Sequence, residues 1–301
     1  MVSTLNPTTQ DFLNNVNRIA AQMMQAQTQL STGLKVNVVS DAPDVISPLL
    51  QAQANLSTAQ QVSSNLGQVS TEVNTGEQAL ESATSLYDQV QTLSAEGATS
   101  TQTASGRAGI AQQLQSIEQQ MVGLANTSVN GRYIFSGDTD HAQPYTFDAT
   151  QTDPVSVYQG SASTRTIQAS NGTTFPVALT AQRIFDSADP ATNVFTSINN
   201  MVTALNSNDQ AAISTANAAL PDVSTYLNGQ LAFYGTAQDA ISAGTTSAST
   251  LVTQLQTQIS GMQDADETQS ILQLTQAQTE EQAVLQSFQQ IPRTSLFDYL
   301  G

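Results

Sequence analysis

Apolar residues recur in the first part of the chain at alternating steps of three and four positions. This heptad spacing places one apolar stripe along each helix and is typical of helices that pair as coiled coils. The first run ends at Ser31, Thr32 and Gly33, a natural helix stop, and the second begins near Asp44, after Pro43, and ends near Gly97. The three runs are Phe12, Val16, Ile19, Met23, Ala26 and Leu30; then Val62, Leu66, Val69, Val73, Gly76, Leu80, Ala83, Tyr87 and Val90; then Ile110, Leu114, Ile117, Met121 and Leu124.

The period changes between Gly131 and about Asp189. Short runs of aromatic and β-branched residues alternate there with Gly, Pro, Asn and Asp, which predicts hairpins of a small antiparallel sheet. Most aromatic residues outside the two ends lie in this segment, so we expect a compact core there. The predicted strands are 132–135, 145–147, 155–158, 164–167 and 175–179.

Helical spacing returns after Pro190. A short amphipathic stretch over 194–205 precedes a heptad run from Ile213 to Met262, which Pro221 interrupts. Because a proline costs roughly 3 kcal/mol inside a helix but little in its first turn, we expect the long helix to begin at Pro221. A last run, with Leu274, Ala277, Glu281, Val284 and Phe288, leads to an apolar end.

The order of helices, β segment and helices predicts the fold class. A long helix cannot leave its apolar stripe in water, so the C-terminal helices should fold back along the N-terminal ones. We therefore expect a mainly α fold: a long antiparallel coiled-coil bundle formed by the N- and C-terminal segments, with a small antiparallel β-rich domain inserted in the middle. The predicted domains are 1–43 with 264–301 (terminal coiled coil), 44–130 with 190–263 (helical rod) and 131–189 (β-rich domain).

The terminal stripes contain small or polar members, such as Ala26, Ala277 and Glu281. Pairing through such residues is weak, so we expect the terminal segments to become ordered only in an assembly. Heptad stripes more often form an intramolecular core, and we assign the runs 62–90, 110–124 and 223–262 to one. We assign the two terminal stripes to an assembly interface instead, because they lack other cover. The predicted interface residues are Phe12, Val16, Ile19, Met23, Leu30, Val284, Phe288, Leu296, Phe297, Tyr299 and Leu300.

The composition restricts the partners. Seven basic against twenty-four acidic residues give a net charge of −17, which disfavours nucleic acid and anionic membrane surfaces. Only 10% of the residues are charged, and the polar remainder is mostly uncharged. Such surfaces can be buried against copies of themselves without desolvating ions. The absence of cysteine excludes disulfides and thiolate metal sites, and the start of the chain has neither the basic nor the apolar region of a cleaved signal peptide.

No candidate site has the arrangement that catalysis or metal binding needs. His141 is the only histidine and lies beside Asp138 and Asp140 in a predicted loop, where a solvated acidic turn is the simpler interpretation. We interpret the acidic cluster at 264–267 as a solvent-exposed junction between two helices. The glycines of 131–137 have the wrong spacing for a phosphate loop. We predict no catalytic, cofactor or metal site and no small-molecule substrate.

Several motifs resemble the flagellin superfamily and, within it, the family of hook–filament junction proteins. The most specific match is Leu124–Gly137. The others are Gln29–Val36, Ser40–Asp44, Arg107 at the start of a helix, Val157–Gly160, Arg165–Ile167, Arg183–Phe185 and Ser295–Leu300. The chain departs from the family in lacking a basic residue beside Met1, in having Lys35 as its only lysine, and in the apolar segment Val36–Val39.

The resemblance implies a non-enzymatic structural subunit of the bacterial flagellum that joins hook to filament by helical self-assembly through its terminal helices. It implies an extracellular location, reached through the flagellar type III apparatus without a cleaved signal peptide. The implied partners are other copies of the chain, a neighbouring hook-side junction protein, flagellin and an export chaperone. Three alternatives stay open: filament flagellin itself, a secreted coiled-coil tip or receptor-interaction protein, and a hydrolase in the β-rich segment.

Overall fold

A computed structural model describes residues 7–168, 172 and 174–289 of the chain, and the contacts divide it into two compact units. The terminal unit comprises Met1–Thr58 and Leu251–Gly301, and the central unit comprises Ala59–Thr250. The helices are α1 (Pro7–Thr32), α2 (Pro43–Gly97), α3 (Ala104–Ala125), α4 (Ala181–Phe185), α5 (Val194–Ser207), α6 (Gln210–Gln263) and α7 (Glu267–Gln289). The strands are β1 (Ser128–Val129), β2 (Arg132–Tyr133), β3 (Thr166–Gln168) and β4 (Thr174–Pro176). The expected mainly α class is confirmed, and the domain boundaries given above stay a prediction.

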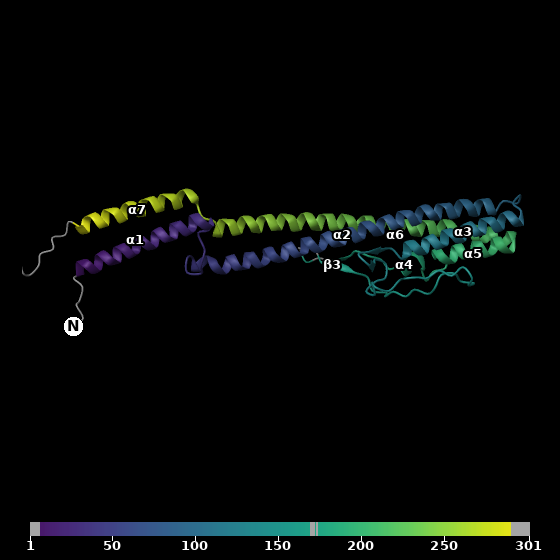
Figure 1. The fold of residues 1–301 in the computed structure, drawn as a ribbon. Coiled ribbons are helices and arrows are strands. Elements are labelled where there is room, and N and C mark those ends of the chain that lie inside the picture. Colours follow the sequence, from purple (N-terminus) through teal and green to yellow (C-terminus); the bar gives the residue numbers. More distant parts are fainter. Residues whose placement is uncertain (1–6, 169–171, 173, 290–301) are drawn as a thin grey trace, which may run out of the picture. The chain divides into compact units, whose positions relative to one another are not determined.

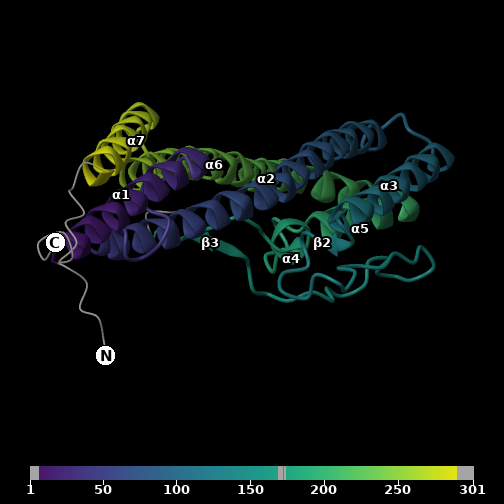
Figure 2. The same ribbon diagram turned by 60° about the vertical axis from the view of Figure 1, so that its left-hand side comes forward.

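In the terminal unit, α1 and α7 lie side by side and antiparallel (Figures 1 and 2). Helix α1 ends where the sequence predicted, because Gly33 adopts φ +71° and its N–H donates to the carbonyl of Gln29 at 2.8 Å. The chain after Gly33 is then tied to the loop before α7. Ala265 N–H donates to Gly33 O, and Lys35 N–H donates to Gln263 O, both at 2.8 Å. These two bonds hold the end of α1 beside the start of α7.

The central unit has a continuous apolar core built on the long helices α2 and α6. Their predicted heptad residues supply it, including fully buried Leu66, Leu80 and Val223. Gly76, another member of the α2 stripe, lies against the ring of Tyr234, and a Cβ at this position would be 2.6 Å from Cε1 of that ring. The α3–α5 pair packs on the same core (Figure 1).

Arg107 ties the start of α3 to the ends of α2 and α5. Arg107 is buried, at 5% exposure, and its guanidinium is held by neutral oxygens only. Nε donates to Gly97 O and Nη2 to Thr99 O, both at 3.1 Å, and Nη1 donates to Asn208 Oδ1 at 2.7 Å. Because the last carbonyls of α2 lack helical partners and carry partial negative charge, a cation there stabilises the turn between α2 and α3.

The β-rich segment contains less strand than the sequence predicted. Two separate two-stranded antiparallel ladders form, β1 with β2 and β3 with β4, and the 145–147 and 155–158 stretches contribute only one bridge, between Phe147 and Val155. The aromatic residues of this segment pack inward as a cluster on the helices instead. Phe135 lies edge-on to Phe185 and Tyr234, with ring centroids 6.4 and 6.2 Å away. The local pattern correctly predicted that this segment contributes aromatic side chains to a core. These rings are buried against helices, however, and not within a sheet.

The expected helix start at Pro221 is wrong. Helix α6 runs without a break from Gln210 to Gln263, with Pro221 inside it. The neighbouring residues Leu220 and Val223 are both buried in the same core, which holds the two sides of the proline on one axis. Tertiary packing therefore offsets the local cost of the missing N–H.

One buried carboxyl stands out in the central core. Glu118 of α3 is 1% exposed, and neither of its carboxylate oxygens has a hydrogen-bond partner among the described residues. Burial, with a further contribution from the charge of Asp153, raises the pKa of Glu118 to about 8. The side chain therefore carries a proton at neutral pH.

Candidate assembly site of the terminal helices

A single line of side chains holds α1 and α7 together, and we call it the seam. Ile19 and Ala26 of α1 and Ala277 of α7 are its most buried apolar members, at 1%, 1% and 3% exposure. At one end of the seam, the rings of Phe12 and Phe288 stack with centroids 3.9 Å apart. The seam consists of Phe12, Val16, Ile19, Met23, Ala26 and Leu30 on α1, and Ser270, Leu274, Ala277, Glu281, Val284 and Phe288 on α7.

The structure brings the predicted interface residues of the two terminal stripes together in this seam. Ile19 is buried in it, while Phe12, Val16, Met23, Leu30, Val284 and Phe288 are half-buried. Leu296, Phe297, Tyr299 and Leu300 lie outside the described residues. Each helix thus covers the stripe of the other, and the half-buried members keep part of their surface exposed.

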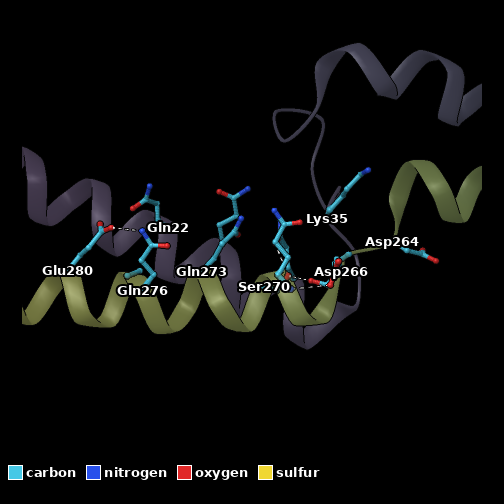
Figure 3. Close-up of a pocket in the computed structure, with 13 residues that line it drawn as sticks. Gln22, Lys35, Asp264, Asp266, Ser270, Gln273, Gln276 and Glu280 are labelled. Atoms are coloured by element: carbon cyan, nitrogen blue, oxygen red, sulfur yellow. Dashed lines mark hydrogen bonds between the residues drawn. The ribbon is translucent and has the colours of Figure 1, made fainter.

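One side of the α1–α7 pair carries a polar groove of about 530 Å³, which we call the glutamine groove (Figure 3). Lys35 lies near one end of it, and its Nζ donates to the carbonyl of Gly261 at 3.4 Å. Gln276 and Glu280 lie farther along α7 and are joined by a 3.1 Å hydrogen bond. The glutamines that line the groove are Gln22, Gln25, Gln29, Gln269, Gln273 and Gln276.

The acidic cluster near this groove has a structural role. Asp266 Oδ1 accepts from the N–H of Gln269 at 3.1 Å, which caps the first turn of α7. Asp264 accepts from the hydroxyl of Ser260 in the last turn of α6. Across the residues that the structure covers, no three acidic or histidine side chains gather as metal ligands would. His141 is 84% exposed, with its Nε2 3.7 Å from Asp140, and makes no nucleophile–base arrangement.

The two helices of the pair also carry exposed aliphatic residues that the heptad pattern missed. Leu13 and Met24 of α1 are 43% and 67% exposed, and Ile271 and Leu285 of α7 are 55% and 45% exposed. Each of these four follows a seam residue by one position in the sequence. These residues could have been identified from the sequence as the apolar residues of the two helices that do not belong to a heptad run. We call these four residues the apolar flank.

A second exposed apolar patch of the terminal unit follows α1. Val36 is buried, but Val38 and Val39 are 56% and 68% exposed. Val39 lines a shallow groove of about 500 Å³ with Ile46 and Leu50 in the first turns of α2. The apolar character of Val36–Val39 was visible in the sequence, whereas its division into one buried and two exposed valines required the structure.

None of the helices within the described ranges is long and apolar enough to cross a bilayer.

The sequence and the fold are both similar to those of known flagellar proteins. Residues 2–140 match the family described as the bacterial flagellin N-terminal helical region. The chain is 30% identical over 219 residues to flagellar hook-associated protein 3 of Salmonella typhimurium, covering 64% of this chain and 63% of the relative. It is 28% identical over 240 residues to flagellar hook-associated protein 3 of Escherichia coli, covering 74% and 73%. The solved structure of a Vibrio parahaemolyticus protein assigned as flagellar hook-associated superposes with a TM-score of 0.65 at 20% identity, over 74% of this chain and all of that one.

Proposed function

We propose that this chain belongs to the bacterial flagellin superfamily and is a structural subunit of the flagellum that joins the hook to the filament. The curated relatives named above are hook-associated proteins, which favours this role over that of filament flagellin. The observation that carries the proposal is the α1–α7 pair, which buries only a narrow seam and keeps large aliphatic side chains exposed. A globular enzyme has no need of such a surface, whereas a subunit of an assembly does.

The mechanism we propose is donation of the terminal helices to a helical lattice. Two helices that bury only one narrow seam between them gain little stability from packing, so neighbouring subunits add the missing cover. A contact between different faces of identical subunits propagates rather than closing. In this proposal the half-buried seam residues, together with Leu296, Phe297, Tyr299 and Leu300, form the assembly interface.

The proposed partners are other copies of the chain, a hook-side junction protein, flagellin and an export chaperone. The subunit acts without catalysis, and it leaves the cell through the flagellar export apparatus without a cleaved signal peptide. The uncharged polar surface supports this proposal, since contacts between identical subunits then desolvate few ions.

A deletion strain of the source bacterium tests the junction role. We expect cells without filaments and with monomeric flagellin in the medium, both reversed by the wild-type gene. Normal filaments and normal motility in the deletion strain would contradict the proposal and favour a secreted tip or receptor-interaction protein.

Electron microscopy separates the junction protein from filament flagellin. Purified protein incubated with short flagellar seeds should not extend them into long filaments. Self-sustaining filaments of micrometre length would show that the chain is a flagellin.

A further inference from the structure

Residues 145–156 form a short hairpin in the β-rich segment, which we call the latch hairpin. Two backbone hydrogen bonds join its arms, one on either side of the bridge described above. Asp148 N–H donates to Pro154 O at 2.8 Å. Ser156 N–H donates to Thr146 O at 3.0 Å. The two arms therefore hold each other, and the hairpin can move as one piece.

The latch hairpin is attached firmly at its base and weakly at its tip, residues 149–153. At the base, Tyr145 N–H donates to Oδ1 of Asn126, which follows α3, at 3.0 Å, and Asn126 Nδ2 donates to Tyr145 O at 2.8 Å. At the tip, one hydrogen bond reaches a helix within the part of the chain that the structure describes. Nδ2 of Asn199, in α5, donates to Thr152 O at 3.1 Å. The tip can therefore lift while the base stays in place.

Glu118 of α3 lies close to this tip. Asp153, which belongs to the tip, is the charged residue that acts on Glu118. Both carboxylate oxygens of Glu118 are closed off from solvent and have no hydrogen-bond partner among the described residues. An ionised carboxylate in this place has neither water nor a donor to stabilise it, so the closed hairpin favours the protonated form.

The helices around Glu118 bring no cation to it. Helix α5 contains no titratable residue, and the other ionisable residue of α3, Arg107, lies three turns away with its guanidinium bonded to oxygens. Glu81 of α2 lines a groove on the opposite side of α3. The carboxylates of α6, Asp222 and Asp239, are exposed. A negative charge on Glu118 is therefore left without a counter-ion.

The hairpin and its base add only negative charge. Asp153 raises the pKa of Glu118 through its own charge, in addition to the larger effect of burial. Asp148 is exposed and accepts from the hydroxyl of Thr150 at 2.7 Å. Asp186, which follows α4, accepts from the hydroxyl at the base of the hairpin, and burial is the main cause that raises its pKa. Loss of the proton from Glu118 thus places it against a like charge on the tip.

We propose that the latch hairpin is a proton-operated conformational switch: the protonated carboxyl of Glu118 keeps it closed on α3 and α5, and loss of that proton lets its tip lift into solvent. In the open form the carboxylate is hydrated and water screens its repulsion from Asp153. The apolar inner side of the hairpin, with buried Pro154 and Val155, is then uncovered. This inference goes beyond the proposed function and does not depend on it, because it concerns a single subunit.

The pKa of Glu118 sets the pH range of the switch. In the closed form burial raises the pKa to about 8 from the ordinary value of 4.5, and in the open form the carboxyl regains the ordinary value. Opening therefore releases a proton at any pH between these two values. The equilibrium constant for opening should rise by up to about tenfold per pH unit from pH 5 to pH 8 and level off above pH 8.

Thiol labelling measures this opening, because the chain contains no cysteine of its own. V155C places one thiol on the buried side of the hairpin, where Val155 is 8% exposed. The labelling rate of the folded full-length protein is divided at each pH by that of the same protein unfolded in urea. This ratio should rise by up to about tenfold per pH unit between pH 5 and pH 8, and in V155C/E118Q, which cannot ionise at position 118, it should stay constant. The same rise in both proteins would overturn the proposal.

Two further variants separate lifting of the tip from unfolding of the whole unit. V223C places the thiol in the fully buried core of α6 and should label at least roughly tenfold more slowly than V155C, because local opening needs less free energy than global unfolding. Equal rates at the two positions would show that no separate latch exists. N199A in the V155C protein removes the hydrogen bond at the tip and should raise the labelling ratio about fivefold at every pH without changing its slope. An unchanged ratio would mean that the tip is not held at α5, which also contradicts the proposal.

Discussion

The terminal and central units are built on the same heptad pattern but differ in what the pattern buries. The fully buried side chains of the central unit include large rings, such as Phe135, Phe185 and Tyr234. The buried side chains of the terminal unit, within the residues that the structure describes, are aliphatic or small, such as Ile19, Ala26 and Ala277. Because the stabilisation from burial scales with apolar area, the central unit can stand alone, and the terminal unit gains most from a partner.

Truncating one ring in each unit gives the largest expected difference. Phe135→Ala removes a fully buried ring and should lower the free energy of unfolding of the central unit by about 3–5 kcal/mol. Phe12→Ala removes a half-buried stack and should cost less than about 1.5 kcal/mol. Urea unfolding followed by circular dichroism reports both units, whereas tyrosine fluorescence reports the central unit, because every tyrosine except Tyr299 lies in it. An equal loss of fluorescence-monitored stability in both variants would break the comparison.

Glu118 tests whether the central core tolerates a charge. Burial raises its pKa to about 8 from the ordinary value of 4.5, so the folded state holds a proton that the unfolded state releases. The group therefore reduces stability as pH rises from about 4.5 to 8. Relative to Glu118→Gln, the wild type should lose on the order of 3 kcal/mol between pH 5 and pH 8. The same pH dependence in both proteins, measured by urea unfolding, would show that Glu118 is not the cause.

Two glycines of α2 test how tightly the central helices approach each other. A Cβ at Gly76 would be 2.6 Å from Tyr234, whereas a Cβ at Gly67 would meet nothing within 4 Å. Gly76→Ala should therefore destabilise the protein by about 1–3 kcal/mol. Gly67→Ala, the matched control in the same helix, should stabilise it by about 0.5–1 kcal/mol. Thermal unfolding followed by circular dichroism measures both, and a stabilising Gly76→Ala would mean that the ring moves aside at little cost.

The smallest expected effect concerns the ion pair between the β-rich segment and α2. Arg165 Nη1 lies 2.7 Å from Glu72 Oε2, and both side chains are partly exposed, at 26% and 18%. Because solvent screens such pairs, Arg165→Gln should lower the free energy of unfolding by only about 0.5–1 kcal/mol. Urea unfolding at low and high salt checks this, since the difference from the wild type should shrink as salt is added. A loss above about 2 kcal/mol would mean that Arg165 supports the core in another way.

Much of the fold was predictable because long, strongly periodic segments leave few alternatives. The spacing from Phe12 to Leu30 and the glycine at 33 predicted α1 and its end, and Pro43 and Gly97 predicted the limits of α2. Three of the predicted strands overlap β2, β3 and β4, whereas the strands predicted at 145–147 and 155–158 and the break at Pro221 were wrong for one physical reason. Local propensity indicated a sheet and a helix start, but packing against the central core outweighed both.

The sequence alone determined which residues form the terminal stripes and which residues come directly before and after them. It also determined that only 10% of the residues are charged, so that most of the helix surface is uncharged. Only the tertiary structure decided that glutamines such as Gln25 of α1 and Gln273 of α7 line one groove of the α1–α7 pair. The reason is that a helix fixes the angles among its own residues, while the side on which two helices present them together depends on how the helices are paired.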